Sequence, residues 1–321
     1  VDRLAAAVMA FQRSYELDGD GIIGSKTLEL LNRTNREKME QVVANLERLR
    51  WLEQQKPQSY VLVNLPSQML WAVENGKTAF EMKVVVGMPW RATRDFTTTV
   101  TGVRFNPTWT VPYGIKMADM LPKLKEDPYA LTDKGIEFYK GYGTERVTID
   151  PATINWNKIS NKEASLIRMI QTSGDHNALG YVRILMDNEF NMYMHDTNHR
   201  ELFDLADRTK SSGCIRLHEP EKMAQWVLSH NKDLTRHDIR RKIDSGETED
   251  IKAADNFPVY VVYQTIWTDK GGKLVFGADI YKRDKKLIEA LATQKGFWLP
   301  DKKEQMAMTK HESVTTLASA E

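Results

Sequence analysis

One cysteine is the clearest candidate for chemistry in this chain. Cys214 is the only cysteine in 321 residues, and it follows Ser211, Ser212 and Gly213. A thiol attacks a carbonyl as the thiolate, and a neighbouring imidazole or backbone N–H donors lower its pKa from about 8.5. A lone cysteine is also commonly a small buried hydrophobe. The polar run before Cys214 disfavours a core strand, and His195 lies upstream in the same region. These residues together favour a nucleophile.

A cysteine and a histidine together indicate acyl transfer through a thioester. We expect His195 to act as the base, the alternative being a structural histidine at a strand end. Backbone N–H groups of Gly213 and Cys214, with that of Ser212, are expected to form an oxyanion hole. Arg216 follows two positions later and shares the face of Cys214 if the segment is extended. It either holds a substrate carboxylate or pairs with a local acid such as Glu219.

Other side chains near these two are expected to frame a cleft, and Ser211 is expected to contact the substrate. Tyr193 shares the strand face of His195, and Trp109 lies on another strand, over 108–112; each either lines the cleft or lies in the core. Asp196 alternates to the opposite face, so it is expected to be structural, and a backbone carbonyl is expected to orient the imidazole. The remaining histidines considered are expected at the surface: His176, His199 and His218.

Composition excludes several classes of function. The net charge is +1, so no electrostatic attraction to nucleic acid is implied. No apolar run approaches 18 residues, and the single cysteine rules out an internal disulfide. No set of His, Cys, Asp and Glu has zinc spacing, so we expect neither a metal nor a cofactor. The chain starts at Val1 without a signal peptide, and we expect it to be a processed or trimmed form.

The elements that position these residues are mostly strands. Apolar residues alternate with period 2 from residue 60 to 112 and again from 181 to 195, and Asn75-Gly76 predicts a hairpin turn. We predict a catalytic domain over 59–296. Residues 114–176 lack this period but are rich in aromatic residues, so we predict an inserted lid there.

The N-terminal part is predicted to be helical. Residues 4–31 read as helix, loop, helix. Residues 35–58 read as a connecting helix, in which an amphipathic stretch with an apolar stripe covers 35–52. That stripe comprises Met39, Val42, Val43, Leu46, Leu49, Trp51 and Leu52. The Asp18–Gly21 turn could be read as a calcium loop, but it lacks the later bidentate Glu. Residues 297–321 are predicted to be a polar tail.

The site motif resembles that of a known family. Tyr193-x-His195-Asp196-Thr197 followed by Ser-x-Gly-Cys-h-Arg at 211–216 is similar to the signature of L,D-transpeptidases of the YkuD family. That family usually reads Ser-His-Gly-Cys, and here Ser212 replaces the His; the family gives the role of base to the upstream His. Residues 106–112 resemble the family's strand before the acceptor cleft, and 258–263 with 279–284 resemble the C-terminal part of the large periplasmic YcbB-type group.

The first 34 residues resemble the peptidoglycan-binding type 1 module. The similarity rests on Phe11-Gln12, Leu17, Asp20-Gly21, Gly24 and Thr27-Leu28. Glu16 stands where that module usually has Gly, and its first helix is missing or cut short. The resemblance therefore implies a truncated wall-binding module over 1–34, and the alternative is a helical packing unit without a ligand.

The resemblance implies an α+β protein with a mainly-β YkuD-type catalytic domain, an inserted lid and a small helical module. It implies a periplasmic enzyme, exported or membrane-anchored through a segment missing from this chain. The implied activity is 3→3 cross-linking of peptidoglycan: Cys214 takes the acyl group of a tetrapeptide stem and releases D-Ala. Implied partners are stem peptides, other cell-wall synthases and carboxypeptidases, and carbapenems as covalent inhibitors. The alternatives are hydrolysis of stem peptides or wall-anchored lipoprotein, and non-catalytic wall binding.

Overall fold

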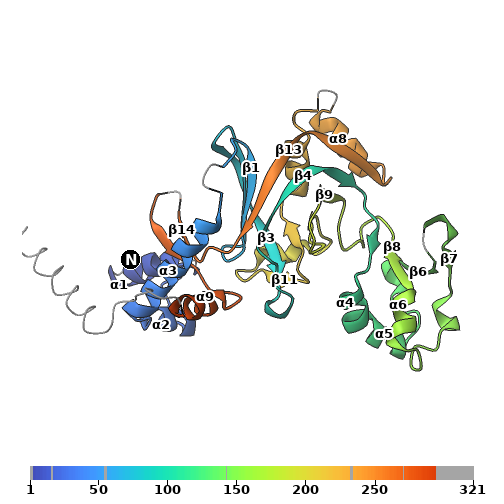
Figure 1. The fold of residues 1–321 in the computed structure, drawn as a ribbon, viewed down its shortest axis with the longest axis horizontal. Helices are drawn as coiled ribbons and strands as arrows, with labels where there is room; N and C mark the ends of the chain where they lie inside the picture. The colour runs from blue at the N-terminus through green and yellow to red at the C-terminus, as the bar shows by residue number, and fades with distance from the viewer. Residues whose placement is uncertain are drawn as a thin grey trace, which may run out of the picture. The chain divides into compact units, whose positions relative to one another are not determined.

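A computed structural model describes residues 3–15, 17–53, 56–141, 143–231, 234–269 and 271–293. The described chain forms two compact units (Figure 1). The first takes the described residues of 1–56, 64–67 and 263–293, and the second takes those of 57–63 and 68–262. The predicted polar tail, 297–321, lies outside the described residues, as does Glu16.

The second unit is built on one nine-stranded sheet. Its order is β11-β3-β12-β10-β9-β4-β13-β1-β2, and β2 also pairs with β3, so the sheet closes on itself like a barrel. The strands are β1 (Tyr60–Asn64), β2 (Met69–Glu74), β3 (Lys77–Gly87), β4 (Phe96–Phe105), β9 (Val182–Met186), β10 (Met194–His195), β11 (Thr209–Ser211), β12 (Ile215–Leu217) and β13 (Glu249–Val262). The mainly-β prediction is confirmed.

The first hairpin shows why the sequence folds this way. Glu74 of β2 pairs with Lys77 of β3, and Asn75 and Gly76 between them have φ of 51° and 73°. A two-residue turn with two positive φ values matches the twist of the flanking strands, and Asn-Gly accommodates it at little steric cost. The predicted turn is confirmed.

The register of three central strands separates a core face from a site face. Met194 of β10 pairs with Ile184 of β9 and Ile215 of β12, and none of the three is exposed. The next row joins His195 to Arg183 and Arg216. Because successive side chains point to opposite faces of a strand, this second row projects away from the core. The polar chemistry is therefore concentrated on one face.

A smaller subdomain is inserted between β4 and β9. Its sheet has the order β5-β8-β6-β7, from β5 (Trp109–Thr110), β6 (Ile136–Lys140), β7 (Val147–Thr148) and β8 (Arg168–Gln171). Its helical segments are α4 (Tyr113–Ile115), η2 (Lys116–Met120), α5 (Leu121–Glu126), η3 (Thr132–Lys134), η4 (Gly143–Glu145), η5 (Pro151–Thr153) and α6 (Asn161–Leu166). It has its own core, which includes Leu124, Phe138, Trp156 and Met169. We call this segment the inserted subdomain; it lies where the sequence predicts an insertion.

Short helical elements complete the second unit. They are η1 (Pro89–Arg91), η6 (Arg200–Asp204), α7 (Pro220–Val227) and α8 (Arg236–Asp244). Helix α8 begins with a capping box in which the Thr235 side chain accepts from the backbone of Asp238 and the Asp238 side chain accepts from that of Thr235. Reciprocal capping satisfies two backbone N–H groups that a helix start otherwise leaves unpaired.

The first unit is mostly helical. It contains α1 (Arg3–Ser14), α2 (Ser25–Leu31), α3 (Asn35–Trp51) and α9 (Arg283–Ala292), with a hairpin of β14 (Ile266–Thr268) and β15 (Leu274–Phe276). Ala44 of α3 packs with Ile288 and Leu291 of α9. Among the described helices of the whole chain, none combines the length and apolar character needed to cross a bilayer.

The turn after α1 is organised by one amide. Gln12 is buried; its Nε2 donates to Asp20 Oδ1 at 2.7 Å, and its Oε1 accepts from Gly21 N at 2.8 Å. Asp20 Oδ1 also accepts from Ile22 N at 2.8 Å. These contacts use the Asp20 carboxylate to close the turn.

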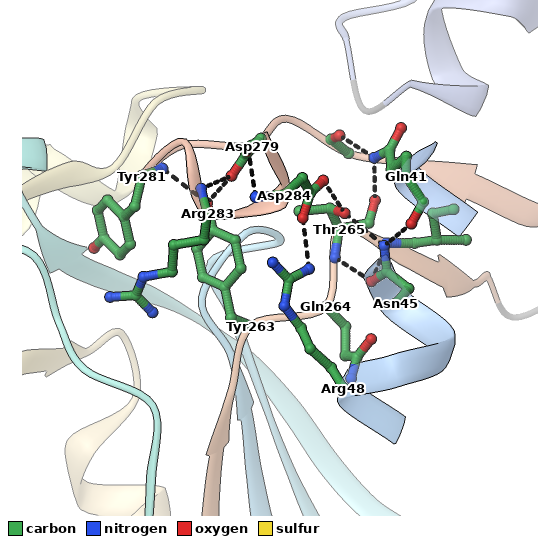
Figure 2. Close-up of polar contacts among 12 residues, drawn as sticks. Gln41, Asn45, Arg48, Tyr263, Gln264, Thr265, Asp279, Tyr281, Arg283 and Asp284 are labelled. Atoms are coloured by element: carbon green, nitrogen blue, oxygen red, sulfur yellow. Dashed lines mark hydrogen bonds and ion pairs between the residues drawn. The ribbon is translucent and has the colours of Figure 1, made fainter. Parts of the chain in front are cut away.

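The buried face of α3 is polar, which corrects the predicted apolar stripe. Its four buried side chains are Gln41, Ala44, Asn45 and Arg48, at helical spacing. In contrast, Leu46 and Trp51 are 57% and 59% exposed. Figure 2 shows the polar side chains directed from α3 toward the segment that follows β13.

Those side chains satisfy backbone groups where the chain passes from β13 to β14. Asn45 Oδ1 accepts from Thr265 N and Ile266 N at 2.7 and 3.1 Å, and Gln41 Nε2 donates to the carbonyl of Thr265 at 2.9 Å (Figure 2). A buried backbone N–H without a partner is costly, so an amide is the better side chain here.

An ion pair extends the same network. Arg48 Nη1 lies 2.5 Å from Asp284 Oδ1, and both side chains are largely buried. Asp279 accepts from the Tyr263 hydroxyl at 2.6 Å and from the backbone N–H of Asp284 at 2.9 Å. The segment from Tyr263 to α9 therefore belongs to the first unit. We predicted a catalytic domain to residue 296, whereas the second compact unit ends at Val262.

Candidate active site

The loop that carries Cys214 joins β11 to β12. Its backbone is anchored on both sides, because Met88 N donates to Ser211 O at 2.9 Å and Ile215 N donates to Tyr193 O at 2.8 Å. Gly213 has φ of +115°, a conformation that side chains with a Cβ rarely adopt. Glycine before the cysteine is therefore required by the backbone path of the loop.

Two hydroxyl groups hold this loop from inside. Ser211 Oγ donates to Cys214 O at 2.6 Å and accepts from Gly213 N at 3.1 Å. Thr93 Oγ1 donates to Gly213 O at 2.8 Å and accepts from Gly87 N at 2.8 Å. Both side chains are buried. They fix the position of Cys214.

This arrangement corrects two expectations. The Gly213 N–H is already bound to Ser211 Oγ, so it is not available to an oxyanion in this conformation. Ser211 is a buried loop clamp and not an exposed substrate contact. Within the described residues, the backbone N–H of Cys214 has no hydrogen-bond partner, so it remains the candidate oxyanion donor.

The imidazole of His195 is held in one tautomer. It is buried, and Nδ1 lies 2.5 Å from the carbonyl oxygen of Asp196. A carbonyl only accepts, so Nδ1 carries the proton and Nε2 keeps its lone pair. Burial, with the nearby Arg216, lowers the pKa of His195 from 6.5 to about 3. The ring is therefore neutral at ordinary pH and able to take up a proton.

Cys214 is a thiol at rest. Burial raises its pKa above the ordinary value, although the backbone of Tyr193 and the charges of Arg183 and Arg216 oppose this shift. This corrects the expectation of a thiolate favoured by the histidine. Among the described hydrogen bonds, none joins the Cys214 sulfur to the His195 ring.

Arg216 and Tyr193 share the face of the base. Arg216 Nη1 donates to Thr197 Oγ1 at 3.2 Å, and its Nε is buried without a partner. The alternative partner, Glu219, instead accepts from Lys222 at 3.2 Å. Tyr193 lies under the guanidinium of Arg183, whose Cζ is 3.7 Å from the ring centroid. Neither Arg216 nor Tyr193 is among the buried residues of the hydrophobic core.

Ser212 and Trp109 occupy different surroundings. Ser212 is exposed, and its Oγ accepts from Arg91 Nη1 at 3.0 Å. Arg91 in turn forms two hydrogen bonds with Asp119 of the inserted subdomain, at 2.5 and 2.8 Å. Trp109 starts the small sheet of that subdomain and packs on its core. Its contact with a substrate stays a prediction.

The remaining polar residues are structural or peripheral. Asp196 accepts from Tyr181 N at 3.0 Å and from Arg200 Nη1 at 3.1 Å, so its carboxylate does not orient the imidazole. The expected backbone acceptor is present as the Asp196 carbonyl. The three histidines that were predicted to lie at the surface are exposed: His176, His199 and His218. In the described part of the chain, no group of three or more His, Cys, Asp or Glu could hold a metal.

Two residues of the site were not predicted. Arg183 is the one charged side chain in the apolar run Val182–Met186. A charge inside such a strand is a sequence feature that could have indicated a functional residue. Thr93 lies in the loop between β3 and β4, far from Cys214 in sequence, and it has no local signal. Only the pairing of distant segments brings its hydroxyl to the nucleophile loop.

The fold and this site fit a known class of cysteine enzyme. A model of the YkuD L,D-transpeptidase catalytic domain matches residues 58–261, so the chain belongs to the YkuD family and contains its L,D-transpeptidase catalytic domain. A protein of Haemophilus influenzae named as a putative L,D-transpeptidase is 31% identical over 229 residues. That match covers 71% of this chain but 45% of the relative, so the chain spans less than half of that protein's length.

Solved structures of the family are more distant. A cysteine-to-serine mutant of an Enterococcus faecium L,D-transpeptidase matches with 14% identity and a TM-score of 0.28, covering 64% of this chain and 50% of its own. A Mycobacterium smegmatis L,D-transpeptidase matches with 10% identity and a TM-score of 0.30, covering 64% and 58%. An E. faecium catalytic domain acylated by ertapenem matches with 14% identity and a TM-score of 0.30, covering 65% and 99%. Family membership rests on the domain match and not on these similarities.

Proposed function

We propose that this protein is a peptidoglycan L,D-transpeptidase that forms 3→3 cross-links through an acyl-enzyme on Cys214. The observation that supports this most directly is a neutral His195 with an unprotonated Nε2 on β10, the strand that pairs with β12 directly after Cys214, the only cysteine of the chain, in a YkuD domain. The donor is the tetrapeptide stem, and the scissile bond joins the L-centre of meso-diaminopimelate to the terminal D-Ala.

The first half-reaction forms the thioester. Nε2 of His195 takes the thiol proton as the sulfur of Cys214 attacks the carbonyl carbon. The oxyanion accepts a hydrogen bond from the backbone N–H of Cys214. Collapse of this intermediate breaks the C–N bond, and the proton on Nε2 passes to the departing amine of D-Ala.

The second half-reaction resolves the thioester. The side-chain amine of a second stem attacks the thioester carbonyl, and Nε2 takes a proton from that amine. The new amide forms, the C–S bond breaks, and the sulfur recovers its proton. If water replaced the amine, the same residues would release a tripeptide, so exclusion of water decides between transfer and hydrolysis.

The finer features belong to the same proposal. The inserted subdomain acts as a lid, and the Arg91 contacts that link Asp119 to Ser212 of the nucleophile loop favour this role. The protein is of the large YcbB-type group and works in the periplasm beside cell-wall synthases and the carboxypeptidases that supply tetrapeptide stems. Residues 1–34 bind the wall through the helix–turn–helix closed by Gln12 and Asp20. Carbapenems acylate Cys214.

Product analysis of purified muropeptides tests the activity. The native protein should convert disaccharide tetrapeptides into 3→3 linked dimers and free D-Ala in equal amounts, whereas Cys214→Ala should produce neither. Formation of tripeptide without dimers would show that the protein is a hydrolase and not a transferase. Absence of both products, with retained wall binding, would support the non-catalytic alternative. In parallel, mass spectrometry with a carbapenem should show one covalent adduct on the native protein and none on Cys214→Ala.

A further inference from the structure

A row of arginines crosses the site face of the main sheet. Arg183 on β9 and Arg216 on β12 are the direct register partners of His195 on β10, one on each side. Paired residues on adjacent strands project to the same face, so both guanidinium groups flank the base. Arg104 of β4 continues the row beyond Arg183.

Among the described residues, neither flanking guanidinium group has a counterion in contact, and Asp250 acts on Arg183 only at longer range. Arg104 is paired with Asp250 through two hydrogen bonds at 2.5 and 2.6 Å, so that carboxylate is already engaged. In the residues that the structure describes, Arg183 and Arg216 form no ion pair, and the Nε of each is buried without a hydrogen-bond partner. Glu201 acts on Arg216 only at longer range and accepts a hydrogen bond from His199. The site therefore has an excess of positive charge beside Cys214.

The face of Tyr193 orients one of these groups. The Cζ atom of Arg183 lies 3.7 Å from the centroid of the Tyr193 ring, so the guanidinium stacks on an aromatic face. A stacked guanidinium keeps its in-plane N–H donors free for a planar anion. The stack thus holds Arg183 ready for two parallel hydrogen bonds to a carboxylate.

We propose that Arg183 is a specificity-determining residue that binds the carboxylate on the D-centre of the diaminopimelate side chain of the donor stem. The proposal rests on the proposed function, which supplies that donor. The donor carries two carboxylates. That of D-Ala lies three bonds from the scissile carbonyl carbon, and that of the diaminopimelate side chain is several bonds further away. Arg216 is two residues from Cys214, whereas Arg183 lies two strands away from β12, about 10 Å. Arg216, the nearer arginine, is therefore assigned to the D-Ala carboxylate. Arg183 is assigned to the more distant carboxylate of the diaminopimelate side chain.

A pair of donors isolates this contact. One is the tetrapeptide stem, and the other is the same stem with the side-chain carboxylate of diaminopimelate amidated. Native protein should show kcat/KM about 10- to 100-fold lower for the amidated donor, because a charge-assisted pair becomes a neutral one. Arg183→Gln should lose a similar factor on the free acid, mainly in KM, and little on the amide. Arg183→Lys should recover part of the loss.

A matched variant controls for the loss of a stacked arginine. Arg146 stacks on Tyr139 in the inserted subdomain, with Cζ 4.6 Å from the ring centroid. Arg146→Gln should leave the preference between the two donors at the native value. If Arg183→Gln reduced both donors equally, or reduced neither, the assignment would be overturned.

Binding separates failure of this inference from failure of the proposed function. Dissociation constants of both donors for Cys214→Ala, measured by calorimetry, need no turnover. A preference for the free acid that disappears in the Cys214→Ala/Arg183→Gln protein supports the assignment even if the native protein forms no cross-links. Equal binding of the two donors, or no binding of either, rejects it.

Discussion

At the scale of single residues, the cysteine and histidine of this site are both uncharged at rest. Burial works against charge on each group: it raises the pKa of the Cys214 thiol and lowers that of the His195 imidazole. The site therefore does not keep a preformed thiolate–imidazolium pair. In the proposed mechanism, charge develops on these groups only when a substrate carbonyl is present to receive the sulfur.

Alkylation rates test this resting state. The rate of carboxamidomethylation of Cys214 by iodoacetamide should rise with pH past the ordinary cysteine pKa of about 8.5, without a plateau near neutrality. Mass spectrometry at a series of pH values gives the rate directly, because the chain has one cysteine. A plateau at pH 6–7 would mean that a thiolate is already present.

The hydroxyl of Thr93 should matter for rate as well as stability. Thr93→Val keeps the shape but removes the donor to Gly213 O and the acceptor for Gly87 N. We expect kcat to fall about 10- to 100-fold with KM little changed, because a displaced nucleophile loses its line of attack. Thr93→Ser keeps the hydroxyl and should restore most of kcat. If the Val and Ser variants had equal kcat and KM, the hydroxyl of Thr93 would not position Cys214.

At the scale of elements, what could be predicted depended on where the partner groups lie. The β2–β3 hairpin follows from Asn75-Gly76, and the site face of β10 follows from alternation around His195. Helix α3 was predicted within a residue at each end, but its buried face was assigned wrongly. Periodicity assumes that a helix buries apolar residues. Here the buried partners of α3 are backbone N–H and carbonyl groups near Thr265, more than 200 residues away in sequence. No local sequence pattern indicates such distant partners.

Substitutions on the polar and apolar faces of α3 should show which of the two faces is buried. Asn45→Ala leaves the buried N–H groups of Thr265 and Ile266 without their acceptor, so the free energy of unfolding should fall by about 1–3 kcal/mol. Leu46→Ala is the matched control, since its side chain is 57% exposed, and it should change that free energy by less than about 0.5 kcal/mol. Urea unfolding measures both. A larger loss for Leu46→Ala would restore the apolar stripe as the buried face.

At the scale of the whole molecule, the chain forms two compact units, and the sequence pattern does not indicate where the boundary between them lies. The strand β13 ends at Val262, and the next residue, Tyr263, already belongs to the first unit. The apolar run across this point reads as one strand, so composition gives no boundary signal. The boundary becomes visible in the contacts that join the chain after Val262 to α3, such as the ion pair of Arg48 with Asp284 and the hydrogen bonds of Asn45 with Thr265.

Acid should destabilise the second unit through its active-site histidine. The folded pKa of His195 is lowered from 6.5 to about 3, so between these values the unfolded chain binds a proton that the folded chain does not. Stability is therefore fully present above pH 6.5 and is lost as the pH falls, by up to about 1.4 kcal/mol per unit. Burial raises the pKa of Asp196, which works in the opposite direction.

Comparison with His195→Gln isolates the histidine, because Asp196 is present in both proteins. The difference in unfolding free energy between the two should change with a slope of up to about 1.4 kcal/mol per pH unit between pH 6 and pH 4 and should vanish above pH 7. Unfolding of the second unit, followed by hydrogen exchange of the Met194 and Ile215 amides, measures it without interference from the first unit. A difference that is constant across this range would mean that the folded imidazole takes up a proton near pH 6.5. Burial would then not be keeping the imidazole neutral, and part of the protein would carry a charged His195 near neutral pH.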